Sequence, residues 1–308
     1  MLDVCLLGTG GMYPLPDRAL TALYVRNEGA AVLIDCGEGT QTAIRRFELR
    51  FKPIGTILIT HFHADHISGL PGLLLTLGNE GRREPVDIWG PAGLSQIVDG
   101  LRVIVPELPF EVRVRELHPG QEHSFPACGL EIRAVPLDHG APCFGYRLEK
   151  RRPGKFDPQA AKALGIPVTL WSRLQKGEAV DAFRPEDVLG PERRGIRLLY
   201  ATDTRPVAAL ARLGREADLL ILEGMFGQPE KQSRAVESRH MTMWEAAEIA
   251  ARAGARELWL THFSPANPEP EQFSEALRVI FPNTVIEPEG RFRSLLFPTA
   301  ETESNLSL

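Results

Sequence analysis

Short apolar runs alternate with amphipathic segments along the chain. Runs rich in β-branched residues predict strands, while apolar residues three and four positions apart predict helices. Strands are predicted at residues 3–7, 22–26, 31–35, 56–60, 86–89, 111–117, 130–135, 144–148, 196–202, 219–222 and 257–261. Helices are predicted at residues 40–47, 73–77, 92–103, 207–212, 243–253 and 269–281, with Thr40 and Thr242 as candidate N-caps. Strands interleaved with helices indicate an α/β fold with a mixed sheet.

One long segment, residues 150–195, interrupts this alternation. It is rich in proline and glycine, its basic side chains outnumber its acidic ones, and Ile166, Leu170 and Trp171 give it an apolar element. A connection of this length is usually functional or disordered. It is either a basic arm, inserted into a single domain over residues 1–308, that contacts an anionic polymer, or a solvated insertion with incidental charge. The candidate contacts in the arm are Lys155, Arg173 and Lys176.

Composition narrows the class of protein. The chain has 308 residues, of which 43% are hydrophobic, and a net charge of −5. It therefore lacks an overall basic field, so a polyanion would have to meet a local patch or bound metal ions. The four cysteines are scattered without a CxxC pair, which is typical of a reducing compartment. Without a signal peptide or a membrane-length apolar run, the sequence predicts a cytoplasmic protein with no membrane segment.

A histidine cluster follows the predicted strand at residues 56–60. His61, His63, Asp65 and His66 lie within six residues of one another, on a turn between this strand and a helix. Histidine and aspartate are usual nitrogen and oxygen ligands of zinc. A surface loop that happens to be rich in histidine is the alternative. Because the chain has only eight histidines, three of them here, we favour a metal site.

Further ligands are expected where later strands end, because α/β folds collect their sites there. His139, Asp203 and His262 each follow an apolar run and precede turn residues. Alone, each would more simply be a cap or a turn former. With the histidine cluster they predict a pair of ions that would lower the pKa of a water and neutralise charge on an ester. The predicted ligands are His61, His63 and His139 for one ion, Asp65, His66 and His262 for the other, and Asp203 as the bridge.

Two more residues are candidates for acid catalysis. His240 precedes a predicted helix and could protonate a leaving alkoxide. Glu223, at the end of the strand at residues 219–222, could orient and charge it. A helix-cap histidine on the surface and an ordinary strand-end carboxylate are the alternatives. His118 and His123 are expected in a solvated turn between strands.

Several motifs resemble known families. Residues 60–66 resemble the signature of the metallo-β-lactamase superfamily. The segments that narrow the resemblance to the ribonuclease Z family, the transfer-RNA 3′-processing endonucleases, are residues 6–10, 34–41, 69–73, 137–139, 145–147, 203–204 and 261–265. Residues 153–157 and 162–167 are similar to the exosite region of that family. The similarity extends over nearly the whole chain.

This resemblance implies an αββα sandwich, two zinc ions per subunit, a homodimer, and an arm that clamps the elbow of a transfer-RNA precursor. The ligand types also suit manganese or iron. It further implies that Asp65 is the proton acceptor and His240 the proton donor, with Glu223 behind His240. Cleavage would leave a 3′-hydroxyl on the transfer RNA and a 5′-phosphate on the trailer.

Three segments depart from the family pattern. The loop that often reads Pro-x-Lys-x-Arg-Asn is here residues 14–19, which keep Pro14 and Arg18, so Arg18 is a further candidate RNA contact. The arm tip at residues 168–171 and the strand-end segment at residues 223–226 also differ. The metal chemistry matches the family at every position, while the parts that select the RNA are altered.

Two other functions are alternatives. One is a metal-dependent hydrolase of small phosphodiesters, sulfate esters or lactones, because the scaffold serves many reactions. The other is a non-catalytic RNA-binding protein on an inactive hydrolase, which the complete set of candidate ligands argues against.

Overall fold

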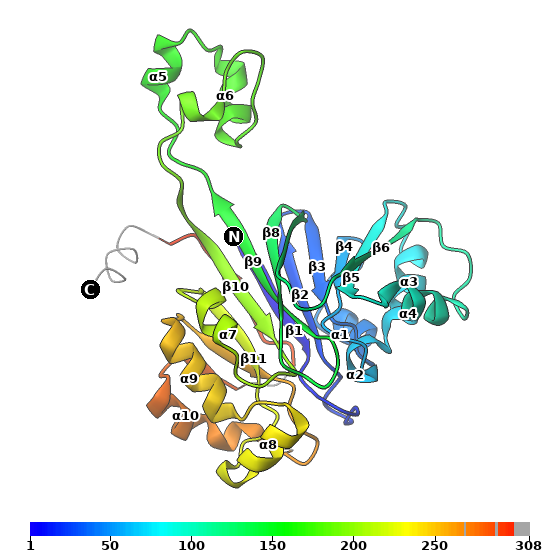
Figure 1. Cartoon of the computed structure of the whole chain (residues 1–308). Helices are drawn as coiled ribbons and strands as arrows, with labels where there is room; N and C mark the ends of the chain where they lie inside the picture. The colour runs from blue at the N-terminus through cyan, green and yellow to red at the C-terminus, as the bar shows by residue number, and fades with distance from the viewer. Residues whose placement is uncertain (268, 287–288, 299–308) are drawn as a thin grey trace. The chain divides into compact units, whose positions relative to one another are not determined.

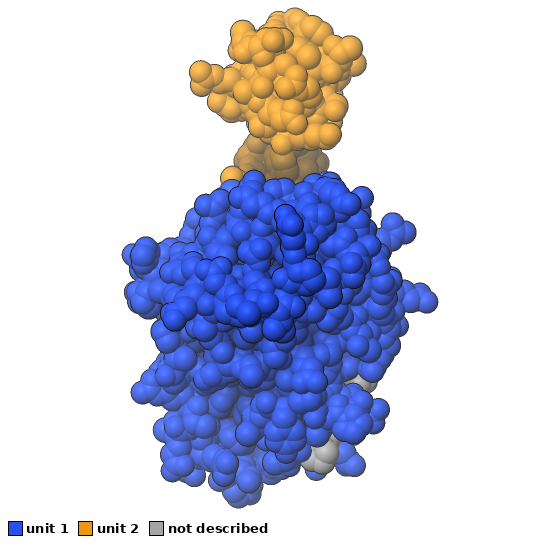
Figure 2. Space-filling model, turned by 90° about the vertical axis from the view of Figure 1, so that its right-hand side faces the viewer, with its two compact units in different colours: residues 1–149, 197–295 blue, residues 150–196, 296–308 orange. Residues whose placement is uncertain are grey.

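The computed structural model describes residues 1–267, 269–286 and 289–298. It contains two seven-stranded sheets with helices on their outer faces (Figure 1). The chain divides into two compact units, coloured separately in Figure 2. The first is Met1–Glu149 with Arg197–Leu295, and the second is Lys150–Ile196 with residues 296–298.

The first sheet is built from the N-terminal half and one late strand. In spatial order it contains β14 (Phe292–Leu295), β1 (Leu2–Gly8), β2 (Ala22–Asn27), β3 (Ala30–Ile34), β4 (Ile54–Leu58), β5 (Val86–Pro91) and β6 (Val112–Leu117). The pairs from β14 to β3 are antiparallel, and those from β3 to β6 are parallel. The parallel part therefore places the carboxyl ends of its strands along one edge.

The second sheet comes from the rest of the chain. Its order is β13 (Thr284–Val285), β12 (Leu258–Thr261), β11 (Leu219–Glu223), β10 (Arg193–Ala201), β9 (Phe144–Arg152), β8 (Leu130–Pro136) and β7 (His123–Ala127). The strands from β10 to β13 pair in parallel, so their carboxyl ends also share an edge. The pairs β7–β8 and β8–β9 are antiparallel.

Helices bury the outer face of each sheet. On one side lie α1 (Thr40–Arg46), α3 (Leu70–Asn79) and α4 (Leu94–Arg102); on the other lie α7 (Ala208–Leu213), α9 (Met243–Ala253) and α10 (Ser274–Ile280) (Figure 1). Leucines of α3 pack with β3 and β4, and alanines of α9 pack with β11 and β12. The short α2 (Ala64–Ile67) and α8 (Gln232–Ser238), with η2 (Pro229–Lys231) and η3 (Pro270–Phe273), lie in connections of the same unit. This arrangement is the predicted αββα sandwich.

Helix caps test the local predictions. Thr242 caps α9 as predicted, because its hydroxyl accepts from the Glu245 N–H in a capping box. The prediction for Thr40 is wrong. Gly39, with φ 93°, occupies the N-cap position of α1, a left-handed conformation that glycine adopts without strain. Thr40 is the first helical residue, and its hydroxyl donates to the Gly37 carbonyl instead.

Other boundaries also differ from the predictions. The segment predicted as one helix at residues 269–281 starts as η3 and becomes α10 only at Ser274. His123, predicted in a turn, is the first residue of β7. The sequence analysis missed β7, β13 and β14, which are short or have a mixed polar pattern.

The second unit has a small core of its own. It contains α5 (Pro158–Ala163), α6 (Val168–Gln175) and the short η1 (Pro185–Asp187). Buried Ala161, Ile166, Leu174 and Val188 form an apolar cluster, against which Trp171 packs. The Trp171 indole N–H donates to the Ile166 carbonyl at 3.0 Å. The apolar residues of this segment therefore fold it locally; its role as an arm stays a prediction.

Among the helices of the described ranges, none combines the length and apolar character that crossing a membrane requires.

Candidate metal centre

The candidate ligands lie just beyond strand ends. His61 and His63 follow β4, and Asp65 and His66 belong to α2. His139 follows β8, Asp203 follows β10 and His262 follows β12. Asp203 and His262 both have φ 55°, a left-handed conformation that turns the backbone sharply after the strand. Each sheet contributes to the centre, and the structure brings all seven residues together.

One group consists of His61, His63, His139 and Asp203, whose ligand atoms all lie within 4.8 Å of one another. His61 Nε2 is 3.6 Å and His139 Nε2 is 3.8 Å from Asp203 Oδ2. His139 Nε2 is 3.4 Å from His63 Nδ1. Three imidazole nitrogens and one carboxylate oxygen form a donor set that could hold a metal ion.

The second group consists of Asp65, His66 and His262. His262 Nε2 is 3.3 Å from Asp65 Oδ2 and 3.2 Å from His66 Nε2. Asp203 Oδ1 lies 3.3 Å from His66 Nε2 and 3.2 Å from His262 Nε2. The two oxygens of Asp203 therefore face different groups, which is the geometry that a bridging carboxylate needs.

Burial makes these groups unusual without a cation. His61 and His66 are fully buried and Asp203 is 2% exposed. Within the described part of the chain, His61 Nε2 is buried without a hydrogen-bond partner. Buried polar atoms are normally paired, so a bound cation would account for this atom. The donor types and their burial fit a metal ion.

The electrostatics of His61 and Asp203 favour the protonation states that bind metals. Burial and the neighbouring His66 hold the pKa of His61 well below its usual value, so this imidazole is neutral. Burial alone would raise the pKa of Asp203, but His262, His66 and His61 outweigh it and hold that pKa well below the usual range. A neutral imidazole and an ionised carboxylate are the states that coordinate a cation.

A buried carboxylate behind the centre fixes His66. Asp35, which directly follows β3 and is fully buried, accepts from His66 Nδ1 at 2.8 Å. It also accepts from the Thr60 N–H at 2.8 Å and from the Thr60 hydroxyl at 3.0 Å. The bond to Nδ1 leaves Nε2 of His66 directed at the second group. The sequence analysis did not assign this role to Asp35, although it is a polar residue at a strand end, as Asp203 is.

The loop after β1 closes against the second group. The Met12 N–H donates to Asp65 Oδ2 at 2.7 Å. Gly11 lies so close to His262 that a Cβ added to it would be 2.7 Å from the ring atom Cε1. Only glycine fits here without moving the imidazole.

His240 and Glu223 form a pair beside the centre. His240 Nδ1 donates to Glu223 Oε2 at 2.8 Å, and Glu223 is fully buried and accepts from the Thr204 N–H at 2.6 Å. Burial alone would lower the pKa of His240, but the Glu223 carboxylate outweighs it and raises that pKa to about 9. Arg205 holds the loop by donating to the His240 carbonyl and pairing with Glu245. His240 is therefore a charged hydrogen-bond donor. Its Nδ1 lies 4.0 Å from Asp203 Oδ2, next to the candidate ligands.

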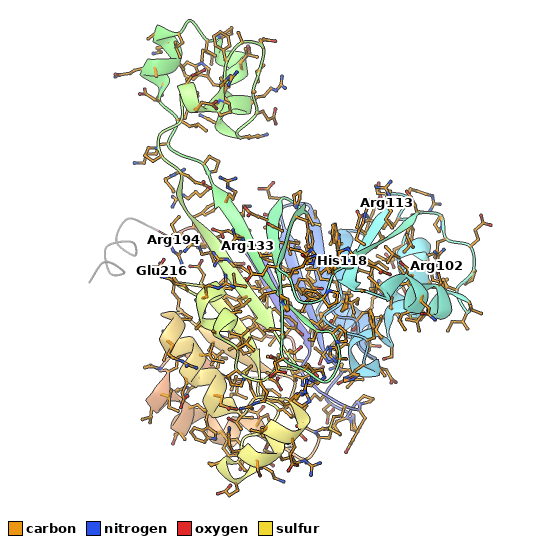
Figure 3. The ribbon with its side chains drawn as sticks, viewed as in Figure 1. Arg102, Arg113, His118, Arg133, Arg194 and Glu216 are labelled. Atoms are coloured by element: carbon orange, nitrogen blue, oxygen red, sulfur yellow. The ribbon has the colours of Figure 1, made fainter. Side chains whose placement is uncertain are left out.

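The remaining candidates are not members of the two ligand groups. His118, at the end of β6 (Figure 3), is exposed. Among the described residues, neither His118 nor His123 joins a group of possible metal ligands. Arg18 is half-buried with its guanidinium 5.6 Å from the centre of the Phe263 ring.

The three candidate contacts of the arm belong to the second unit. Lys155, Arg173 and Lys176 are exposed, and Arg173 pairs with Glu178 at 2.8 Å. The charge of Arg173 is therefore partly neutralised inside the arm.

Known proteins are similar to nearly the whole chain. The model of the Beta-lactamase superfamily domain matches residues 30–263. A ribonuclease Z of Lachnospira eligens is 49% identical over 301 residues, which cover 96% of this chain and 99% of the relative. The chain belongs to the ribonuclease Z family. A second ribonuclease Z, of Lachnoclostridium phytofermentans, is 51% identical over 287 residues, covering 92% of this chain and 94% of the relative.

A solved structure of the ribonuclease Z family supports the same conclusion. The crystal structure of the short form of human tRNase Z, ELAC1, superposes with a TM-score of 0.70 at 27% sequence identity. The match covers 96% of this chain and all of that one. The predicted family, fold and enzyme class, a ribonuclease Z-type hydrolase, are therefore confirmed.

Proposed function

We propose that this protein is a metal-dependent endoribonuclease that removes the 3′ trailer from transfer-RNA precursors. The observation that carries the proposal is the convergence of two groups of possible metal ligands, all buried except His63, beside the His240–Glu223 pair. A phosphodiesterase needs cations for the phosphate and a proton for the leaving oxygen, and the site offers both. The relatives named ribonuclease Z support an RNA substrate.

We propose two zinc ions per subunit. His61, His63 and His139 would hold one, Asp65, His66 and His262 the other, and Asp203 would bridge them. When bound, such ions lower the pKa of a water and neutralise charge on the non-bridging oxygens of the phosphate. Manganese or iron would suit the same donors, so metal analysis of the purified protein decides between them.

The protein's own residues would then move the protons. Asp65, held by the Met12 N–H, would accept the proton of the attacking water. The oxygen of this water bonds to phosphorus as the bond from phosphorus to the ribose O3′ breaks. His240, charged by Glu223, would donate its proton to that O3′. The products are a 3′-hydroxyl on the transfer RNA and a 5′-phosphate on the trailer.

RNA contacts are proposed outside the centre. Arg18 would contact the RNA near the site, and Lys155, Arg173 and Lys176 would contact it through the arm. Replacing the three arm residues by glutamate should raise the KM for RNA because phosphate contacts dominate such binding. Hydrolysis of bis(p-nitrophenyl) phosphate, which is too small to need the arm, is the control. An unchanged KM for RNA would refute the role of the arm.

The family resemblance further implies a homodimer, which light scattering on the purified protein would test. The cytoplasmic location stays a prediction.

The decisive experiment is an assay on precursor transfer RNA with and without CCA after the cleavage site, with metal content measured on the same sample. We expect a 3′-hydroxyl product and about two metal ions per chain. Cleavage of bis(p-nitrophenyl) phosphate without cleavage of any precursor would refute the RNA substrate. Metal-free protein that still cleaves RNA would refute the mechanism.

A further inference from the structure

We propose that a cavity beside His240 holds the base of the last nucleotide retained on the transfer RNA, and that Asn267 reads this base with a preference for adenine. This inference rests on the proposed function, because it assigns the cavity to one nucleotide of that substrate. It is carried by the lining of the cavity and by the unpaired amide of Asn267.

The cavity has a volume of about 360 Å³. Ligand pockets start at roughly this size, so it is large enough for a single base but not for a folded RNA element. It opens between the loop after β1, the segment after β11, α8 and the segment after β12. His240 is part of its lining, so the cavity adjoins the candidate general acid.

The walls suit an aromatic ring. Phe226 and Met225 are buried, while Met12 and Tyr13 on the opposite loop are 60% and 55% exposed. Large apolar side chains that stay exposed in the lining of a cavity indicate a surface that binds a ligand or partner. Bases that leave a stack are commonly bound by such side chains, since every base offers a flat face.

Asn267 supplies hydrogen-bonding atoms that could recognise a base. Its side chain lines the cavity and is only 3% exposed, yet within the described chain neither its amide nitrogen nor its amide oxygen has a hydrogen-bond partner. Leaving both atoms unpaired destabilises the protein, and a ligand that hydrogen-bonds to them would remove this penalty. The Asn267 N–H donates to the Ser264 carbonyl at 2.9 Å, which fixes the backbone of this loop. A carboxamide pairs with adenine through one donated and one accepted bond.

The chemistry decides which nucleotide is bound. The oxygen that His240 protonates is the O3′ of the last nucleotide kept on the transfer RNA. A cavity that shares His240 therefore lies on the leaving-group side of the phosphate. Lys231 and Arg234, exposed side chains of the same lining, are placed to meet the phosphates of the strand that enters it.

The test compares four precursors that differ only in the base before the cleavage site. For the metal-loaded wild-type protein, we expect kcat/KM for adenine to exceed that for the other bases by roughly tenfold. In Asn267→Leu this preference should fall to within about twofold. Asn79→Leu, the same exchange at an exposed position of α3, should keep it. Equal rates for the four bases in the wild type, or an unchanged preference in Asn267→Leu, would overturn the proposal.

A second measurement separates this proposal from the proposed function. Adenosine 3′-monophosphate presents a base on the leaving-group side of a phosphate, and it should inhibit hydrolysis of bis(p-nitrophenyl) phosphate more strongly than cytidine 3′-monophosphate does. If the protein cleaves no RNA but shows this difference, the pocket stands and the RNA substrate falls. If it cleaves RNA with no base preference and binds both nucleotides equally, the pocket falls and the RNA substrate stands.

Discussion

Gly11→Ala tests whether the loop after β1 sets the position of His262. The added Cβ would be 2.7 Å from His262 Cε1 and 2.9 Å from Nε2, whereas ordinary contacts begin near 3.4 Å. Gly11 is not one of the described residues whose φ is positive, so its backbone accepts alanine without strain. The perturbation is therefore confined to the contact with the His262 ring. The imidazole must retreat, and with it the nitrogen that faces Asp65 and Asp203.

The expected effect follows from this displacement. The ring has to move by roughly 0.7 Å, whereas metal–ligand distances tolerate only about 0.2 Å. Misplacing a group by about 1 Å costs roughly 10²-fold in rate, and disturbed support of a ligand costs about 10–100-fold in metal affinity. Crowding of this kind also destabilises a fold by about 1–3 kcal/mol. We therefore expect a folded protein with weakened metal binding and a kcat/KM lowered by about 10²-fold.

The assay is hydrolysis of bis(p-nitrophenyl) phosphate together with metal titration and thermal unfolding. Gly100→Ala is the matched control, because its Cβ would meet nothing within 4 Å in the exposed face of α4. That control should keep full activity and gain up to about 1 kcal/mol from its better helix propensity. If Gly11→Ala binds metal and hydrolyses the ester as the wild type does, His262 does not depend on this loop.

Further predictions concern the residues around the centre. His240→Ala should keep its metal content but lose roughly 10²–10⁴-fold in kcat, and normal cleavage would show that the acid is another group. Glu223→Gln should move the alkaline limb of the pH–rate profile to lower pH, because Glu223 raises the pKa of His240 and its loss lets the imidazole deprotonate earlier; an unmoved limb would contradict the pairing. Asp35→Asn should weaken metal affinity by about 10–100-fold, seen in titration with a competing chelator, since an uncharged amide oxygen is a weaker acceptor for His66 Nδ1 than the carboxylate is. Asp203→Ala should lose metal and activity together, and a metal content equal to the wild type would argue against a bridge.

Much of the site can be predicted from the sequence because polar residues that follow buried strands meet at one edge of a sheet. His139, Asp203 and His262 each follow a buried strand, and strands that pair in one sheet bring such residues to a common edge. These residues can therefore lie close together although they are far apart in the sequence. Their side-chain types, imidazole and carboxylate, indicate that they bind the same metal centre. The sandwich itself follows from strands alternating with amphipathic helices.

Other parts of the site depend on contacts that no local pattern encodes. Asp35 matters because His66 lies within 2.8 Å of it, and Gly11 matters because of the ring of His262. Thr40 shows the same limit at a helix start, where Gly39 with its positive φ takes the cap. Asn267 has an ordinary loop context in the sequence, and only its burial without partners marks it. These contacts are tertiary, so the sequence does not show them, although the place of Asp35 at a strand end makes it a candidate.

The pairing of β14 with β1 has a consequence for biosynthesis. Strand β1 acquires its outer neighbour only when residues 292–295 have been made, and His262, the candidate ligand with the highest residue number, follows β12. A nascent chain therefore carries an open strand edge, which is a site for mispairing, until β14 has been made. It also cannot complete its centre before His262 has been made. An enzyme assembled in this order stays inert until the ribosome has added its last ligand.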